Sequence, residues 1–109
     1  MAYALDLANR IRVHLSGLPG LEEKKMFGGV GFLIQGNMAC GVHGNDLIVR
    51  VGAENYTAAL QQPFTHPFDM TGRPMAGWIT VAPQGYKQDR DFQEWVKKGI
   101  DFTRTLPPK

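Results

Sequence analysis

Residues 28–51 have the sequence GGVGFLIQGNMACGVHGNDLIVRV, in which apolar side chains recur with a period of two. Such alternation is typical of strands that bury one face. Short turn sequences, Gly36 with Asn37 and residues 44–46, separate the apolar segments, and links of this length allow only antiparallel pairing. The pattern predicts an antiparallel meander over residues 26–51, with strands at 30–35, 38–42 and 47–51.

Gly28 and Gly29 interrupt the meander directly after its first predicted strand, residues 25–27. Two adjacent glycines at such a place indicate a bulge or a sharp bend. We expect at least one of them to have a positive φ or to lie where another backbone segment approaches closely. A phosphate-binding loop is disfavoured, because these glycines lead into a strand rather than a helix and no Gly-Lys-Ser/Thr sequence follows.

Helical periodicity appears on both sides of the meander. Residues 3–15 and 89–105 carry apolar side chains at spacings of three and four, and a shorter helix is predicted at 53–60. Glycine and proline in residues 16–20 end the first helix. Gly99 lies inside the last helix, where glycine costs about 1 kcal/mol relative to alanine, and a close contact between helix and sheet would explain it.

The second half of the chain adds two more predicted strands. Residues 65–70 are expected to be extended and confined to a sheet edge, because prolines limit their pairing. Residues 77–81 are rich in β-forming side chains and predict the last strand, and residues 83–85 are expected to be a loop. The order of helix, three or four strands, helix, two strands and helix predicts an α+β fold, a two-layer α/β sandwich with a mostly antiparallel sheet. The core is expected to hold Leu7, Ile11, Leu15, Phe32, Leu47, Val49, Trp95 and Phe102.

The chain has 109 residues, and we expect a single domain over residues 1–109. Hydrophobic residues make up 43% and charged residues 20%, which argues against disorder. The apolar runs are too short for a transmembrane helix, and residues 1–15 lack a continuous signal-peptide core, so we expect a cytoplasmic protein without membrane contact. The net charge is only +2 and the basic residues are scattered, so we expect no sequence-specific DNA binding by the chain alone.

Catalytic chemistry has little support in the side chains present. The three histidines, His14, His43 and His66, have no metal-ligand spacing. Cys40 is the single cysteine, which excludes an intramolecular disulfide, and His43, three residues later in a strand, is expected on the opposite face. The carboxylates form no clear acid–base pair. We therefore assign no catalytic residue, no metal site and no cofactor, and expect a non-enzymatic protein.

Two sequence blocks carry a family resemblance: KMFGGVGF at residues 25–32, followed by GNMAC and LIVRV, and GRPM at residues 72–75. Together with the strand at 77–81 and the helix around Trp95, they resemble the bacterial TfoX N-terminal domain family over nearly the whole chain. The resemblance implies a fold similar to secretion-chaperone-like domains, a link to the TfoX regulators of natural competence, and no catalytic residues. The motif residues that it singles out, for a structural or interaction role, are Met26, Phe27, Gly28, Gly29, Gly36, Met38, Arg50, Gly72, Arg73, Pro74 and Met75.

Two functional hypotheses follow. The first is a regulatory or protein-interaction domain that acts through a protein partner. A homodimer is a further expectation, because the sheet has an edge and the chain has surplus aromatic side chains. The second is a small ligand-binding protein or enzyme that uses a cleft near Gly28 and Gly29, with Cys40 or His43 involved. A concave pocket with polar groups would favour the second, and a broad apolar patch or an open strand edge would favour the first.

Overall fold

The computed structural model of the chain describes residues 4–26, 28–69 and 75–108. The strands are β1 (Leu21–Met26), β2 (Gly29–Ile34), β3 (Asn37–His43), β4 (Asp46–Arg50), β5 (Thr65–Pro67) and β6 (Trp78–Val81). The helices are α1 (Leu5–Leu15), the 3-10 turn η1 (Ala53–Asn55), α2 (Tyr56–Leu60), α3 (Pro83–Tyr86) and α4 (Asp89–Thr103). The strands form one antiparallel sheet of six with the order β1-β2-β3-β4-β6-β5.

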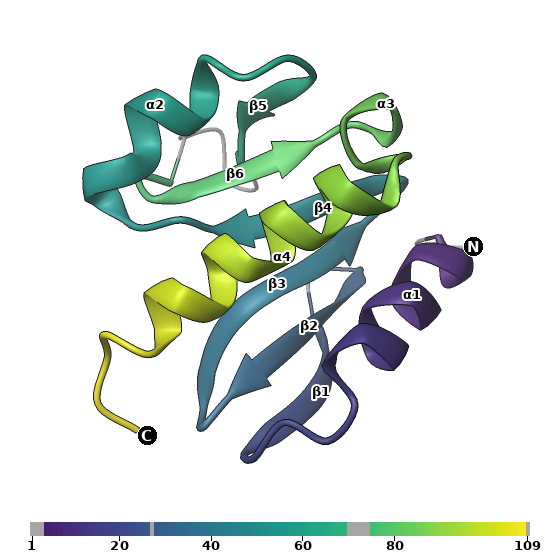
Figure 1. Ribbon diagram of the computed structural model, residues 1–109, viewed down its shortest axis with the longest axis vertical. Helices are drawn as coiled ribbons and strands as arrows, with labels where there is room; N and C mark the ends of the chain where they lie inside the picture. The colour runs from purple at the N-terminus through teal and green to yellow at the C-terminus, as the bar shows by residue number, and fades with distance from the viewer. Residues whose placement is uncertain (1–3, 27, 70–74, 109) are drawn as a thin grey trace.

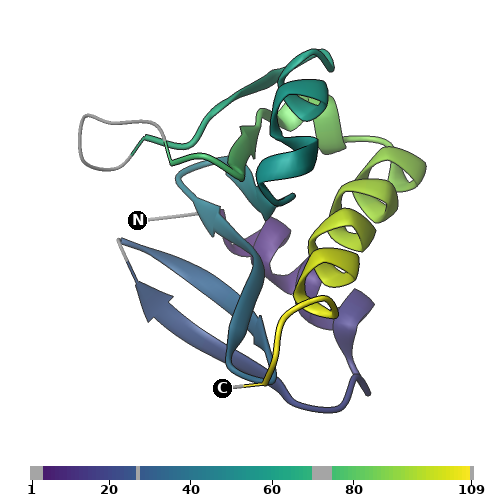
Figure 2. The ribbon, with the colours of Figure 1, turned by 90° about the vertical axis from the view of Figure 1, so that its left-hand side faces the viewer.

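The helices pack on one face of this sheet. α4 crosses β3 and β4, and α1 lies beside it, nearer to β1 and β2 (Figure 1). A side view shows the helices and the strands as two layers (Figure 2). This arrangement confirms the predicted α+β sandwich, with the meander and the strand near residue 79 in a single sheet. None of the described helices has the length and apolar character needed to cross a membrane.

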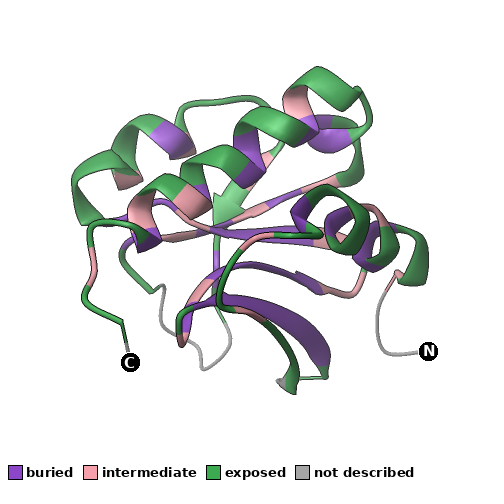
Figure 3. Ribbon diagram, turned by 60° about the horizontal axis from the view of Figure 1, so that its bottom comes forward, coloured by how far each residue is buried: buried purple, intermediate pink, exposed green. Residues whose placement is uncertain are grey.

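The core lies between the two layers, where the buried positions of helices and strands face each other (Figure 3). Leu47 and Val49 from β4 and Ile11 and Leu15 from α1 belong to this core, and all four side chains are fully buried. Apart from Phe102, every residue expected in the core is buried. Phe102 is only half-buried, because it lies near the C-terminal end of α4, beyond the helix turns that cover the sheet centre.

The β1–β2 connection confirms the expectation for the paired glycines. Gly28 has a φ of +74° and lies in the turn between β1 and β2. Gly29 packs against β3 so closely that a Cβ on it would overlap the carbonyl oxygen of Val42. The β1–β2 register runs without a shift to Met26 opposite Gly29. The pair therefore forms a sharp bend, and not the bulge that was the other alternative.

The bulge of the sheet lies elsewhere, between β2 and β3. Phe32 pairs with Cys40 and Leu33 pairs with Met38, so Ala39 is an extra residue on β3. The backbone carbonyl of Ala39 faces α4, and a Cβ on Gly99 would overlap its oxygen. This contact confirms the close approach of helix and sheet that the mid-helix glycine indicated.

The first hairpin turn is shifted by one residue from the prediction, and the second is shorter by one, because Asp46 pairs with His43 and leaves only Gly44 and Asn45 in the turn. Ile34 pairs with Asn37 across the first turn, which leaves Gln35 and Gly36 as the turn residues, with φ of +53° and +87°. Positive φ at both central positions is typical of a type I′ turn, whose twist matches a hairpin. Asn37 was expected in the turn but begins β3, where its side-chain Nδ2 donates to the carbonyl oxygen of Pro107 at 2.9 Å.

Several element boundaries differ from the prediction. β1 begins at Leu21, earlier than residue 25. Residues 22–25 are all charged and exposed, so the apolar alternation that indicates a half-buried strand is absent there. Residues 83–85 are not a loop but part of α3, which has a proline at its first position. The Tyr86 hydroxyl holds α3 in place by donating to the carbonyl oxygen of Asn45 at 2.6 Å. Only residues 65–67 of the extended segment form a strand, at the sheet edge as expected.

Candidate functional site

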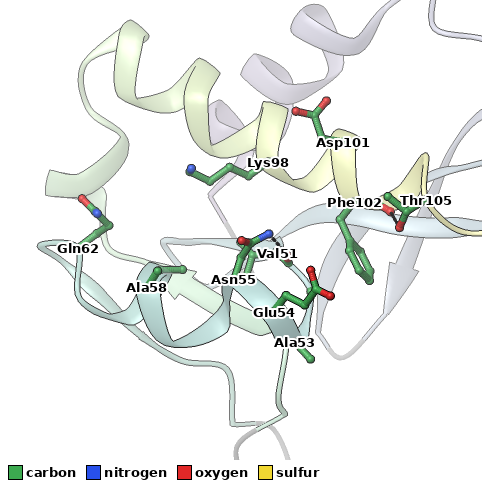
Figure 4. A pocket seen from close by; sticks show the side chains of 12 residues that line it. Val51, Ala53, Glu54, Asn55, Ala58, Gln62, Lys98, Asp101, Phe102 and Thr105 are labelled. Carbon is green, nitrogen blue, oxygen red and sulfur yellow. Dashed lines mark hydrogen bonds between the residues drawn. The ribbon is translucent and has the colours of Figure 1, made fainter.

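A groove of about 820 Å³ lies between η1 and α2 on one side and α4 on the other (Figure 4). Its volume is in the range of sites that take small molecules or the side chains of a bound segment. Apolar groups line its inner surface and polar side chains its rim. The apolar lining comes from Val51, Ala53, Ala58, Ala59 and Phe102, and the polar lining comes from Glu54, Asn55, Gln62, Lys98, Asp101 and Thr105.

The groove is shaped by the way in which the chain leaves β4. The N–H groups of Val51 and Gly52 both donate to the carbonyl oxygen of Gly77, at 2.8 and 3.1 Å. Gly52 has a φ of +87°, and a Cβ on it would lie 2.5 Å from the ring of Phe102. Because glycine leaves this space empty, the Phe102 ring lies against the backbone at the end of the groove. The side chain of Asn55 fixes the first turn of the opposite wall by donating to the Val51 carbonyl oxygen at 3.2 Å.

Two charged groups on the rim have no ionic partner. Lys98 lies on the groove side of α4, with its Nζ 6.0 Å from the centroid of the Trp95 ring (Figure 4). Glu54 lies on the opposite wall. Among the residues that the structure describes, neither forms a salt bridge. Asp101 points away from the groove and pairs with Lys97 at 2.7 Å. The groove therefore offers one unpaired positive and one unpaired negative group across an apolar centre.

A second cluster contains Arg50 and lies at the end of β4, between Trp78 on the sheet face opposite the helices and Phe102 of α4. The carbon at the centre of its guanidinium lies over the rings of Trp78 and Phe102, at 5.0 and 5.1 Å from their centroids. The Trp78 ring lies 6.3 Å from that of Phe68, which in turn lies 6.4 Å from that of His43. Half-burial lowers the pKa of Arg50, because it removes water from the charged form.

The structure does not bring the family-motif residues together in one site. Gly28, Gly29 and Gly36 shape turns and close backbone contacts, and Met38 lies on β3 beside Gly41. Met26 ends β1, and Met75 is exposed before β6. Phe27, Gly72, Arg73 and Pro74 lie outside the described residues. Of the motif residues described, Arg50 is the one with a charged group in a defined environment.

Cys40 and His43 do not form a catalytic pair. Cys40 lies in the core with no exposed surface, and burial raises the pKa of its thiol to about 12. It is therefore a protonated thiol at neutral pH, whereas a nucleophilic cysteine needs its thiolate. His43 lies on the opposite face of β3, against Phe68. The described part of the chain contains no group of three His, Cys, Asp or Glu side chains placed to hold a metal ion.

A smaller cavity of about 360 Å³ lies between α1 and the start of α4. Its polar groups are largely engaged. Arg10 donates to Asp89 at 2.8 Å and to the carbonyl oxygen of Tyr86 at 3.0 Å, and it lies over the ring of Phe92 at 4.2 Å. The His14 ring also packs against Phe92, at 5.7 Å. These contacts explain the cavity as the junction that joins α1 to α3 and α4.

Sequence reasoning missed the groove, because its walls come from residues 51–62 and 98–105, which are distant in the chain. The cleft expected near Gly28 and Gly29 is not among the cavities described above, neither of which has these glycines in its lining. The backbone of Gly29 instead packs directly on β3. Phe102, which lines the groove, was expected in the core, and its place in the apolar stripe of the helix gave no signal for the groove.

No curated protein matches the chain. A sequence profile of the TfoX N-terminal domain matches residues 14–103, which include every described strand, η1, α2, α3 and the whole of α4. The chain therefore belongs to the TfoX N-terminal domain family.

Proposed function

We propose that the chain is a non-enzymatic, cytoplasmic regulatory domain of the TfoX kind that acts by binding a protein partner. The observation that carries this proposal is the family match over residues 14–103. The chemistry of the side chains is consistent with it, because Cys40 is held as a buried thiol and lies on the other face of β3 from His43.

The groove between α2 and α4 is the surface that we assign to the partner. A groove between two helices is a common seat for an amphipathic helix, whose apolar side chains enter while its charged side chains meet the rim. Here the inner surface offers Phe102 and Ala58, and the rim offers Lys98 and Glu54. The occupant is therefore a helix of a partner protein with an apolar ridge, an acidic side chain opposite Lys98 and a basic one opposite Glu54.

The sheet edges are poor alternatives for a partner strand. β1 is an edge strand that carries four consecutive charged and exposed side chains, Glu22, Glu23, Lys24 and Lys25, and charged side chains protect a sheet edge against pairing with another strand. The opposite edge strand, β5, has three residues and includes Pro67. A homodimer, if it forms, would therefore use a side-chain surface rather than a continuous sheet. Light scattering tests this part by comparing the particle mass with 12.1 kDa for one chain.

DNA binding by the chain alone is not part of the proposal. The apolar stripe of α4, with Phe92, Trp95 and Val96, is buried on the sheet, so this face is not free to enter a major groove. Its exposed side mixes Lys97 and Lys98 with Asp101. A specific complex in a mobility-shift titration at physiological salt would contradict this part.

The partner is tested by site-specific photo-crosslinking in the native cells, with the crosslinker at Ala58 in the groove or at Lys24 on β1 as control. Both side chains are exposed in the described structure. We expect one discrete adduct from Ala58 that is absent from Lys24. The crosslinked protein is then purified, and its affinity is measured for the wild-type chain, Ala58→Trp and Lys24→Ala.

Filling the groove with Ala58→Trp should weaken binding at least about tenfold, because a bulky ring occupies the space of the partner side chain. Lys24→Ala should leave the affinity unchanged. Adducts of equal yield at both positions, or a purified partner that binds Ala58→Trp as well as wild type, would contradict the proposal.

A further inference from the structure

We propose that Arg50 is a preorganised binding site for a single carboxylate group. Arg50 itself does not line the proposed partner groove, although the site and the groove share Phe102. Its elements are the guanidinium of Arg50 and the rings of Trp78 and Phe102, which lie 5.0 and 5.1 Å from the guanidinium carbon.

The N–H donors of Arg50 have no acceptor in the described part of the chain. No side-chain hydrogen bond or salt bridge of Arg50 with a described residue is present, and its contacts are the two cation–π interactions. A guanidinium presents its N–H donors as a rigid planar fork, which matches the two oxygens of a carboxylate. Cation–π contacts hold such a group without using these donors as hydrogen-bond donors.

The surroundings hold Arg50 in place rather than leaving it as a flexible surface side chain. Arg50 and Trp78 are paired residues of β4 and β6, so their side chains leave the same face of the sheet. Two glycines with positive φ place the two rings: Gly77, at +91°, directly precedes Trp78, and Gly52, at +87°, lets the Phe102 ring lie against the backbone. A ligand therefore meets a group that has already lost much of its conformational freedom.

Partial burial adds to the driving force for binding. The guanidinium has lost part of its hydration, as the lowered pKa of Arg50 reflects, but it stays protonated at neutral pH. An oxyanion would supply the counter-charge that the described residues do not provide. Folding has therefore already removed part of the water around the Arg50 guanidinium. Less of the free energy of the ion pair is then spent on desolvation when a ligand binds.

The chemistry of the neighbourhood selects a carboxylate over a phosphate. Arg50 supplies one positive charge, which balances the single charge of a carboxylate but leaves one charge of a doubly ionised phosphate uncompensated. Tight binding of phosphates also draws on several Lys or Arg side chains on one face, whereas this cluster contains one cation.

The test is a titration of the isolated, ¹⁵N-labelled chain, monitored by NMR at the Nε–Hε resonance of each arginine. Sodium acetate is the probe, sodium phosphate is the competing oxyanion, and sodium chloride at matched ionic strength is the control. Arg90, exposed on α4, is the internal control in the same spectrum. We expect a saturable shift of the Arg50 resonance with acetate, with a dissociation constant on the order of 10 mM, as suits one charge-assisted contact.

Phosphate should bind at least about threefold more weakly than acetate, and Arg90 should follow ionic strength alone. Two variants that should retain the wild-type backbone spectrum complete the test. Arg50→Lys keeps the charge but not the planar fork, and Trp78→Leu removes one ring. Both variants should weaken acetate binding. In Trp78→Leu the titration is followed at the Arg50 Nε–Hε resonance, and in Arg50→Lys it is followed at the backbone amide of Trp78.

An Arg50 resonance that moves only with ionic strength, or that favours phosphate, would overturn the assignment. So would unchanged acetate affinity in Trp78→Leu. Because this experiment uses no partner protein and no groove variant, its failure is distinguishable from failure of the proposed function.

Discussion

Leu47 and Ile48 are neighbours in β4, but their side chains point to opposite faces of the sheet. Leu47 lies beneath the helices with no exposed surface. Ile48 is also buried, but it shares its face with Arg50, Trp78 and His43, which are half-exposed. The helix layer lies on the other side of the sheet (Figure 2), and from α4 the ring of Phe102 reaches the Arg50 side chain. The first face holds the two layers together, and the second carries polar and aromatic groups that remain accessible to a ligand.

The largest effect should come from truncating these two neighbours. We expect Leu47→Ala to lower the free energy of unfolding by about 4 kcal/mol, because it leaves a cavity between two layers. Ile48→Ala should cost about 2 kcal/mol, because a cavity on a face without a helix layer collapses or hydrates more easily. Chemical denaturation of both variants measures the difference. Equal losses would show that the two faces are packed alike.

Gly99→Ala tests the contact between the two layers from the helix side. Helix propensity alone predicts a gain of about 1 kcal/mol, but the added Cβ would overlap the carbonyl oxygen of Ala39. We expect a net loss of about 2 kcal/mol, because helix and sheet must move apart. Gln93→Ala, at an exposed position of the same helix, is the control and should change stability by less than about 0.5 kcal/mol. A stabilised Gly99→Ala protein would contradict the close contact.

Cys40 on the helix-covered face should make the protein sensitive to alkaline pH. Burial raises the pKa of its thiol from 9.0 to about 12, so the folded state holds this proton more tightly than the unfolded state. The contribution of the protonated Cys40 thiol to the free energy of unfolding is fully present below pH 9 and is lost as the pH rises toward 12. At pH 10 the loss should be on the order of 1 kcal/mol.

Urea denaturation between pH 8 and pH 10 measures this loss, with Cys40→Ala as the matched variant. The variant should be less stable at every pH, but its stability should fall less between the two pH values. Tyr86, whose pKa is also raised chiefly by burial, is present in both proteins and cancels in the comparison. Parallel pH profiles would contradict a fully buried thiol.

The smallest effect should come from Arg50 on the opposite face. Arg50→Lys retains the charge and loses only the planar stacking, so we expect a loss of about 0.5 kcal/mol. The same measurement as for Leu47→Ala applies. A loss of stability as large as that of Leu47→Ala would show that Arg50 has a structural role like that of the residues in the core.

The strands and helices could be predicted because their signals are local. Alternation in residues 28–51 and the helical stripes on either side follow from the period of each element, and the structure confirms them. Gly28 and Gly29 could be interpreted because a double glycine in a strand has few structural explanations. Gln35 could not be predicted as a turn residue, because a positive φ is rare outside glycine and is imposed here by the register of the hairpin.

The candidate sites were harder to predict because they depend on contacts between distant segments. Arg50 was named through the family resemblance, but its neighbours Trp78 and Phe102 come from β6 and α4. Phe102 was expected in the core because it lies in the apolar stripe of the last helix. That stripe does not reveal at which residue the helix extends past the sheet. The groove depends on the path of residues 51–62, which no periodic pattern describes.

The path of the chain between β4 and β6 has a consequence for local opening. The carbonyl oxygen of Gly77 accepts hydrogen bonds from the N–H groups of Val51 and Gly52. These bonds bring together the two ends of the connection that carries η1, α2 and β5. Ala59 is the one buried side chain of η1 and α2, which leaves this unit weakly anchored, whereas α4 is fixed by the core. Its amides should therefore exchange with solvent deuterium through a low-energy sub-global opening, well before those of α4. One wall of the groove thus adapts while the other stays fixed, and an occupant would be detected first as slower exchange in residues 55–60.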